Sequence, residues 1–490
     1  MSALISTWQR RLVLAALVMI LGAVIMFVWS IESGNPPASA LTTGEWMKRL
    51  VAIPILMAFT TFAFATSAMM PMPARAATPS ADAAPAASAK PLMAQVMGIE
   101  WLNPLQRRDY PTEWQLLWAL KLVGANRNDD MVRTDPKSFT TLQSVAGVAY
   151  GNRGTETFKG YYHKYVDELL GKFGTRYVMH AKYFYTVKPD NRKDWRELAG
   201  IHVEFAIPDR LDPVEAQTYL RKSVIGMFNI GNKSFPSLWS RDTPPDVRVT
   251  PGGANAGFTS LNNALDYLEA NPDKSVWVMN WDAPSFPPKD AQINENMVLL
   301  FLAGPQMKTE RAPLAWIGRA ATGNVQDFEK KVGTTRAVEA WKATIATAAH
   351  NANVSVPDIR YTIHDAGKGS DASSSRIGPL GRTLTETMLE FDFQKQTFNT
   401  PALLGEMGAG TALTDVALAI SRANHLGETV LVAGTTDAGH PVAVVVTPPP
   451  QIVPIDPDAD WFRARGENNA YLPWWGRRYD TKYGQQGWSW

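Results

Sequence analysis

Four ionisable side chains in the last third of the sequence have types and spacing that could support acid–base chemistry. His364 and Asp365 close an apolar segment, Asp371 follows in a Gly/Ser-rich stretch, and Glu406 lies in the glycine-rich stretch LGEMGAG. Histidine is the usual general base because its pKa lies near neutral pH. The alternative is structural. A histidine at a strand end can hydrogen-bond a neighbouring loop, and a glutamate beside a helix start can act as a cap.

Other reaction classes lack the residues that they need. The chain has no cysteine, which excludes disulfides, thiolate metal sites and a cysteine nucleophile. Ser373, Ser374 and Ser375 could offer a hydroxyl, but no G-x-S-x-G elbow accompanies them. Lys368 in GKGS lacks the phosphate-loop spacing, H-E-x-x-H is absent, and the seven histidines are scattered. We therefore expect no metal and no cofactor.

Alternating helices and strands must position the four side chains. Apolar residues at helical spacing and short apolar runs bounded by turns are the signals for these elements. Helices are predicted over 113–123, 260–270, 335–350 and 411–424; strands over 175–187, 197–205, 275–281, 356–363, 428–434 and 441–446; a glycine turn over 251–257; and a Gly/Ser-rich loop over 366–375. Two similar units of this kind, residues 96–335 and 336–454, favour a layered α/β fold made by duplication.

The second unit resembles the C-terminal half of the thiolase-like superfamily, the ketoacyl synthases and thiolases. The strand that ends in IHDAGKGSD resembles the family's strand–His–Gly–Thr–Gly loop, and LGEMGAG resembles the loop that carries its second catalytic histidine. The hairpin 430–446, with glycines in its turn, resembles the family's closing hairpin. Upstream, residues 254–279 resemble its nucleophile turn, helix and strand. The resemblance implies a thiolase-like layered αβα duplication.

The departures from that family bear on activity. The nucleophilic cysteine would fall near Gly257, and Glu406 stands where the second histidine is expected. Carbon–carbon condensation in that family needs the thiolate and both histidines. Only His364 remains, so we expect a pseudoenzyme in which His364, Asp371, Glu406 and Gly257 are vestigial. The alternative is an acyl-binding or hydrolytic enzyme that uses His364 with a water.

From about residue 96 to its end, the chain also resembles a narrower family, the membrane-associated proteobacterial adaptors of type VI secretion lipase effectors. The likeness lies in the overall pattern, including the apolar N-terminus and the Trp-rich C-terminus. It implies a non-enzymatic adaptor that binds a phospholipase-type effector and helps to load it on the secretion spike protein. The expected partners are therefore the lipase effector and the spike protein.

The N-terminal 70 residues are expected to form a membrane anchor. Residues 12–29 carry no charge and are about long enough to span a bilayer, and residues 50–70 form a second uncharged run. Arg10 and Arg11 place the N-terminus in the cytoplasm. With two spans, the body faces the cytoplasm from the bacterial inner membrane, which is the favoured reading. If Met47 is the true start, residues 47–76 are a signal peptide with an A-x-A site, and the body is periplasmic.

Two segments flank the body. Residues 71–95 are rich in Pro, Ala and Ser and are predicted to be an extended linker. Residues 455–490 form a tail rich in Trp and Arg, the residue types enriched in binding hot spots. Its partner-binding candidates are Trp461, Trp474, Trp475, Arg477, Arg478, Trp488 and Trp490. The tail could instead wrap the body, or lie at lipid headgroup depth. The net charge of +2 shows no basic excess, so no nucleic acid is expected.

Overall fold

The computed structural model describes residues 90–102, 120–122, 157–174, 177, 198, 200–231, 243–284, 293–307, 312–367, 369–388 and 390–454. All of them belong to a compact unit, Ala89–Trp490, and Met1–Ser88 forms the other unit. The two predicted spans and the tail lie outside the described residues. Within the described part of the chain, no helix is long and apolar enough to cross a membrane.

Eleven strands form one mixed sheet, in the order β3-β2-β4-β5-β1-β6-β11-β10-β8-β9, with β7 pairing β11. The strands are β1 (Ala94–Leu102), β2 (His202–Ile207), β3 (Asp246–Pro251), β4 (Ser275–Asp282), β5 (Asn296–Ala303), β6 (Ala315–Ile317), β7 (Ala321–Thr322), β8 (Ile359–His364), β9 (Thr397–Asn399), β10 (Thr429–Gly434) and β11 (Val442–Thr447).

The two ends of this sheet have the same plan. In the first half, β3, β2 and β4 are parallel, β5 is antiparallel to β4, and β1 is antiparallel to β5. In the second half, β9, β8 and β10 are parallel, β11 is antiparallel to β10, and β6 is antiparallel to β11. The antiparallel pair β1–β6 joins the halves. The fold is therefore a mixed α/β fold in which one strand order occurs twice.

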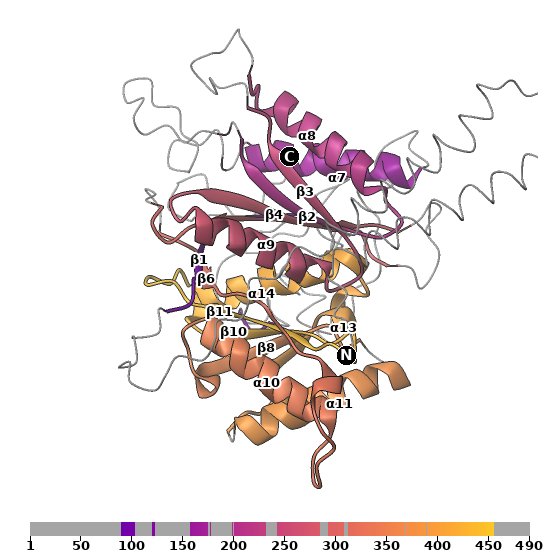
Figure 1. The fold of residues 1–490 in the computed structure, drawn as a ribbon, viewed down its shortest axis with the longest axis vertical. Coiled ribbons are helices and arrows are strands. Elements are labelled where there is room, and N and C mark those ends of the chain that lie inside the picture. The colour runs from indigo at the N-terminus through magenta and orange to yellow at the C-terminus, as the bar shows by residue number, and fades with distance from the viewer. Residues whose placement is uncertain are drawn as a thin grey trace, which may run out of the picture. The chain divides into compact units, whose positions relative to one another are not determined.

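The helices separate the halves and cover them. Figure 1 shows α9 and α14 between the two parts of the sheet, α7 and α8 outside the first, and α10 and α11 outside the second. The helices are α7 (Phe158–Phe173), α8 (Pro213–Met227), α9 (Ala256–Ala270), α10 (Arg336–Asn351), α11 (Asp371–Thr387), α12 (Phe393–Gln396), α13 (Thr400–Leu404) and α14 (Thr411–Leu426), with short 3₁₀ turns η6 (Val325–Asp327), η7 (Val356–Asp358) and η8 (Gly408–Gly410).

Local sequence explains where the helices begin and which strands are buried. The side chains of Thr157, Asp212, Thr335 and Ser370 each accept a hydrogen bond from a backbone N–H in the first turn of α7, α8, α10 and α11. Strands β4 and β5 are buried at every position because helices cover both faces of the sheet. Continuous apolar runs are the expected sequence of such strands.

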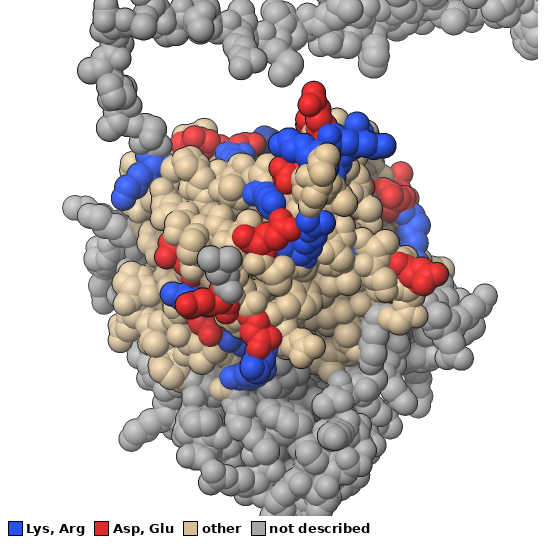
Figure 2. Space-filling view, turned by 90° about the horizontal axis from the view of Figure 1, so that it is seen from below, with Lys and Arg blue, Asp and Glu red and all other residues tan. Residues whose placement is uncertain are grey.

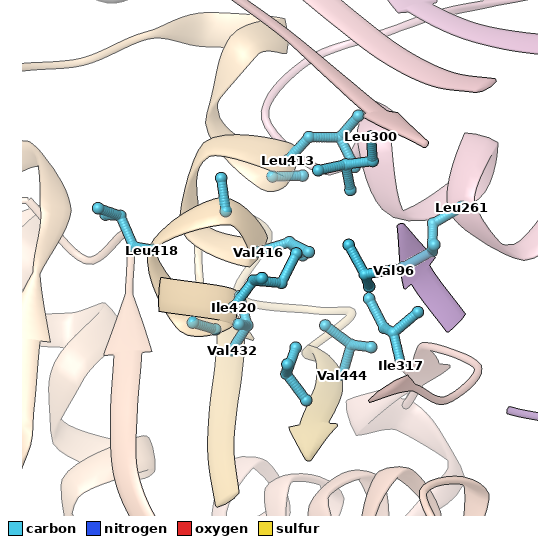
Figure 3. Packing of buried hydrophobic residues seen from close by; sticks show 14 of the residues in the cluster. Val96, Leu261, Leu300, Ile317, Leu413, Val416, Leu418, Ile420, Val432 and Val444 are labelled. Carbon is cyan, nitrogen blue, oxygen red and sulfur yellow. The ribbon is translucent and has the colours of Figure 1, made fainter. Parts of the chain in front are cut away.

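Three apolar clusters fill the spaces between the layers. The inner core lies between the halves, where side chains of α9 and α14 meet the facing sides of the strands. Figure 3 shows Leu261 of α9 and Val416 of α14 beside Val96, Ile317 and Val444 of three strands. The other clusters lie beneath α7 and α8 in the first half and beneath α10 and α11 in the second. Because the inner core contains residues of both halves, it binds them into one unit.

The outer helices of the second half are joined by mixed charges. Lys342 of α10 pairs with Glu386 of α11 at 2.8 Å, and Arg382 pairs with the same carboxylate at 2.6 Å. In Figure 2, the described surface seen from below carries acidic and basic groups side by side, separated by uncharged surface. Exposed pairs of this kind contribute at most about 1 kcal/mol each.

Most predicted elements are confirmed. The structure has helices at 260–270, 335–350 and 411–424, a strand at 275–281 and the hairpin β10–β11. Strand β8 is shorter than predicted, since η7 takes up residues 356–358. Strand β2 begins at His202 and covers only the end of the predicted segment 197–205.

Four predictions need correction or lie outside the described residues. The loop predicted over 366–375 is wrong from Asp371 onward, because Ser370 caps a helix there. The helix predicted over 113–123 is wrong at residues 120–122, which form a turn in which Lys121 has φ +59°. Strand β1 begins at Ala94, so the last two residues of the predicted linker 71–95 belong to the strand. Of the strand predicted over 175–187, only Tyr177 lies in the described part.

Candidate functional site

His364 ends β8 and faces the outer side of the second half. In the parallel pairing with β10, His364 lies opposite Ala433, which belongs to the outer cluster, whereas Ile363 belongs to the inner core. The ring lies 6.1 Å from that of Phe393, and its Nδ1 accepts a long hydrogen bond of 3.4 Å from Ala366 N. Burial alone lowers the pKa of His364 to about 4. The imidazole is therefore neutral at pH 7 and is a weak base.

Asp365 is fully engaged in holding the fold. Its Oδ1 accepts hydrogen bonds from Thr435 N at 2.6 Å and from Thr435 Oγ1 at 2.8 Å, and its Oδ2 accepts one from Thr436 Oγ1 at 2.6 Å. These bonds tie the end of β8 to the turn between β10 and β11. Asp365 therefore contacts that turn rather than the ring of His364.

Asp371 and the serines that follow it belong to the first turns of α11. Asp371 is exposed at the start of the helix, where a carboxylate is favoured by the helix dipole. The hydroxyl of Ser375 donates to the backbone oxygen of Ala372 at 2.8 Å, and that of Ser374 donates to Ser370 O at 3.2 Å. These contacts are local, and they give the serines a structural role in the helix.

Glu406 approaches the loop after β8 without reaching His364. A Cβ added to Gly367 would lie 3.2 Å from Glu406 Oε1 and 3.1 Å from Ser373 Oγ. Burial raises the pKa of Glu406, the nearby Arg376 lowers it, and Asp365 raises it. Among the described residues, no hydrogen bond or ion pair joins His364 to Glu406. The two candidate catalytic groups therefore lie near the same loop but do not act on one another.

Gly257 occupies the place where a nucleophile would be expected, and this place is closed. The residue is buried in the first turn of α9, against α14. A Cβ at Gly257 would lie 2.9 Å from the Cβ of Ala412 and 3.2 Å from Cγ of Leu413. Carbon atoms at 2.9 Å overlap, so even alanine would force α9 and α14 apart. The helix contact therefore leaves no room for a cysteine side chain.

The structure reveals a polar junction between the halves that the sequence did not disclose. Asp282, at the end of β4, forms an ion pair with Arg210 and accepts a hydrogen bond from Ala409 N at 3.0 Å. Asn296, at the start of β5, donates to Gly410 O at 2.8 Å and bonds Thr414. Both residues lie on the first half and hold the loop that leads into α14. The junction thus fixes the loop that contains Ala409 and Gly410, close to Glu406, against the first half.

Asp415 is the ionisable group of this region that sequence reasoning missed. It is 1% exposed in the second turn of α14, and among the described residues its Oδ1 has no hydrogen-bond partner. Burial raises the pKa of Asp415 well above its ordinary value, and the nearby Asp365 raises it further. The signal was available, because Asp415 is the sole acidic residue in the apolar helix 411–424. It was passed over because a single charge on a helix is usually solvated.

Within the described ranges, no group of three or more His, Asp or Glu side chains is arranged to hold a metal ion. Lys368 and all seven partner-binding candidates of the tail lie outside the described residues. The proposed contacts of the tail therefore remain predictions.

Comparison with known proteins identifies a family for one region of the chain. Residues 321–448 match the family model of the type VI lipase adapter protein Tla3, C-terminal region. Over these residues, the resemblance to type VI lipase adaptors seen in the sequence is confirmed. A comparison with curated proteins finds no match.

Solved structures with a similar fold are ketosynthases. One is an oxazolomycin ketosynthase domain from Streptomyces albus JA3453, with 14% identity and a TM-score of 0.44 over 77% of this chain and 100% of that chain. Another is the module 6 ketosynthase of bacillaene synthase from Bacillus subtilis 168, with 10% identity and a TM-score of 0.47 over 73% and 72% of the two chains. β-Ketoacyl-[acyl carrier protein] synthase III from Thermus thermophilus has 12% identity and a TM-score of 0.40, over 72% and 98%. Nothing about activity follows from likeness at this level.

Proposed function

We propose that this chain is a membrane-tethered, non-enzymatic adaptor that binds a phospholipase-type effector and helps to load it on the type VI secretion spike. The observation that carries the proposal is the match of residues 321–448 to the type VI lipase adapter family. That region contains the second half of the sheet from β7 onward and both outer helices α10 and α11. An adaptor implies a protein partner, and the lipase effector is the partner that the family's description names.

The closed helix contact at Gly257 supports a role without catalysis. A cysteine there would overlap Ala412 and Leu413, so the nucleophile is missing and has no space. His364 is buried and neutral, with a pKa of about 4, and has no carboxylate partner among the described residues. A general base works best when its pKa lies near the operating pH. We therefore propose that the body is a pseudoenzyme.

The repeated strand order supports a thiolase-like ancestry for the body. Each half has three parallel strands followed by two antiparallel ones, and each places one helix, α9 or α14, in the middle layer. A layered αβα duplication accounts for this plan without invoking two unrelated domains. In such a fold, the loops near Gly257, His364 and Glu406 would be the remains of a catalytic centre.

The second candidate function is an acyl-binding or hydrolytic enzyme that uses His364 and a water. It requires His364 to accept a proton near neutral pH, and it requires an acidic partner to orient the ring. The buried position of the ring counts against it, and so does the lack of a hydrogen bond or ion pair between His364 and Glu406 among the described residues. Hydrolysis of acyl thioesters and p-nitrophenyl esters by the full chain, compared with a His364→Leu variant, tests this candidate. Activity that depends on His364 would establish it in place of the adaptor.

For the membrane, we propose the two-span arrangement with the body on the cytoplasmic side of the bacterial inner membrane. The support is the pair of uncharged runs at 12–29 and 50–70 and the arginines before the first. Protease added to spheroplasts tests the side. A body that resists digestion until the membrane is broken agrees with the proposal, and digestion in intact spheroplasts supports the periplasmic alternative that starts at Met47.

A pull-down from the native cell tests the adaptor role itself. The full chain carries a C-terminal tag, is extracted in mild detergent, and its partners are identified by mass spectrometry. We expect a lipase-like effector in near-equal amount, with the spike protein also recovered. Recovery of a bound acyl chain and no lipase would overturn the proposal. The variants Trp474→Ala and Trp475→Ala show whether the tail contributes to partner binding, and Gln485→Ala, at a tail residue that is not a candidate, is the control.

A further inference from the structure

The chain enters and leaves the described body at neighbouring positions on one edge of the sheet. Ile317 of β6 pairs with Ala94, the first residue of β1, and also with Val446, near the end of β11. The two residues therefore flank the same strand and lie roughly 10 Å apart, twice the spacing of adjacent strands. The linker arrives at the first of these strands, and the tail departs after the second.

A short hydrogen-bonded path connects the two points. Val453 N donates to the backbone oxygen of Asn424 at 2.8 Å, and the side chain of Asn424 donates to Leu314 O at 2.7 Å. Leu314 N in turn donates to Val96 O at 2.7 Å. The start of the tail, the end of α14 and the start of β1 are thus fixed to one another. We call this side the tether edge and define it by Pro91–Ala94, Leu426 and Ile452.

The candidate catalytic residues lie at the other end of the same strands. In the second half, Gly434 and Val442 pair at the end that also carries His364, whereas Val430 and Val446 pair at the tether edge. In the first half, Asp282 pairs with Asn296 far from the tether edge, whereas Ser275 pairs with Ala303 beside Gln95. We call the opposite side the loop edge. The contact of Asp282 with Ala409 shows that the loop edges of both halves meet.

The tether edge exposes apolar side chains beside the point where the chain leaves. Leu426 is 40% exposed and Ile452 is 41% exposed, two of the five large apolar side chains exposed among the described residues. Ile452 lies over Gly427, because a Cβ added to that glycine would be 3.4 Å from Ile452 Cγ2. Ile452 therefore lies next to the residue that follows Leu426 in the chain. Asn353 Nδ2 holds the linker end through Pro91 O at 3.1 Å.

The segments beyond both points have compositions suited to a bilayer. Upstream of Pro91 the sequence contains the two uncharged runs, and downstream of Pro454 it contains five Trp and the basic residues Arg463, Arg465, Arg477 and Arg478. Trp and Arg side chains favour the headgroup region, where a ring can be half immersed and a guanidinium can meet phosphate. Both segments join the described body at the tether edge.

We propose that the tether edge lies against the lipid surface, with Leu426, Ile452 and the start of the tail at headgroup depth, and that the loop edge is turned away from the membrane and offered to the effector. The occupant of the tether edge is an anionic lipid bilayer. The inference rests on the proposed membrane tether and adds an orientation to it. It assigns the partner to the opposite side, where the acidic residues Asp209, Asp212, Asp371, Glu406 and Asp437 are exposed together with the basic residues Arg210 and His440.

The absence of native cysteine makes the test direct. The full chain is reconstituted in vesicles of phosphatidylethanolamine and phosphatidylglycerol (about 3:1), and a single cysteine at Ile452→Cys or, on the loop edge, at Ala438→Cys carries a fluorescent label. Both positions are exposed. Lipids with a quenching nickel-chelate headgroup report proximity to the surface. We expect quenching at position 452 to exceed that at position 438 by at least two-fold.

Equal quenching at both positions, stronger quenching at 438, or no quenching at either would overturn the orientation. The urea midpoint of each labelled variant shows that it is folded. Flotation of the vesicles after a carbonate wash tests the tether separately, and recovery of the effector in detergent tests the adaptor role, so the three failures are distinguishable. Loss of label mobility at 452 on adding effector, without quenching by lipid, would make the tether edge a protein-binding surface and overturn the lipid proposal.

Discussion

The middle helices α9 and α14 occupy the same place in the two halves but differ in how they are buried. α9 leaves Thr259, Asn263, Asp266 and Glu269 exposed, whereas α14 is buried at every position from Thr411 to His425. α14 contacts β4 and β5 of the first half as well as β8, β10 and β11 of the second. The comparison shows that α14 packs against the strands of both halves, although α9 occupies the equivalent place in the first half.

The buried polar groups of α14 follow from that position. Arg422 is 4% exposed; its guanidinium bonds Glu428, donates to Leu120 O and lies 3.5 Å above the ring of Tyr361. A helix that is surrounded by protein can keep a charge only if every donor is matched. On α9, the corresponding cation contact is Arg319 with Asp266 and Glu269, and these groups are largely in solvent.

The largest expected effect is that of Arg422→Ala, which breaks the most buried ion pair of α14. We expect the free energy of unfolding to fall by about 3–5 kcal/mol, because a buried pair loses one partner and the ring of Tyr361 loses its cover. The measurement is urea unfolding followed by fluorescence. Arg319→Ala, which removes the partner of Asp266 and Glu269 of α9, is the matched control and should cost less than about 1 kcal/mol. Equal losses of unfolding free energy would show that the contacts of Arg422 and Arg319 stabilise the fold to a similar extent.

Each half has one buried histidine on a parallel strand, and the two histidines differ in their partners. His202 of β2 lies 2.8 Å from both Glu204 Oε1 and Asp246 Oδ2, whereas His364 of β8 has no carboxylate among its contacts in the described region. The pKa of His364 is about 4 in the folded protein, against an ordinary value of 6.5. As the pH falls, the unfolded chain therefore binds a proton at His364 before the folded protein does. The stability that neutral His364 provides is thus complete above pH 6.5 and is lost as the pH falls toward 4.

We expect the unfolding free energy of the parent protein, relative to His364→Leu, to fall by roughly 3 kcal/mol between pH 7.5 and pH 4. Urea midpoints at four pH values within this range measure the difference. His350→Leu, an exposed change on α10, should give no such trend. A parent–variant difference that is flat with pH would mean that His364 is accessible to protons in the folded state.

The packing of α9 on α14 gives an intermediate effect. Gly257→Ala should lower the unfolding free energy by about 1–3 kcal/mol, because its Cβ overlaps that of Ala412. Gly253→Ala, where nothing lies within 4 Å, should change it by less than about 0.5 kcal/mol. Adding Ala412→Gly to Gly257→Ala should recover most of the loss, as a double-mutant cycle would report. If the double variant does not recover stability, the contact between residues 257 and 412 is not what excludes a side chain at position 257.

The smallest expected effect is that of Asp415→Asn. Burial raises the folded pKa of Asp415, so its contribution to stability is present below the ordinary value of 3.8 and is lost as the pH rises through the folded pKa. The amide should therefore raise the urea midpoint at pH 7.5 and leave it unchanged at pH 3.5. Asp266→Asn on the exposed face of α9 should change neither midpoint. A lower midpoint for Asp415→Asn at pH 7.5 would show that the carboxylate is stabilised in the fold.

The elements near the candidate site could be predicted because their signals are local. The helical spacing of 260–270 and 411–424, the apolar run at 275–281 and the glycines of the closing hairpin each act within a few residues. The absence of cysteine and the position of Glu406 were likewise visible in the sequence. With the resemblance to thiolases, they led to the prediction that the condensation chemistry is lost. The start of α11 at Asp371 was missed because a serine cap and a Ser/Gly-rich loop use the same residue types.

What the sequence determined by itself is the order of helices and strands, the loss of the nucleophile and the likeness to type VI lipase adaptors. What only the tertiary structure decided is how those parts meet. Gly257 packs against Ala412, and Asp282 accepts a hydrogen bond from Ala409, although the residues of each pair lie more than 40 positions apart in the chain. The common edge of linker and tail is of the same kind, because it depends on the pairing of β1, β6 and β11. Such contacts depend on packing between distant segments, and one sequence carries no local signal for them.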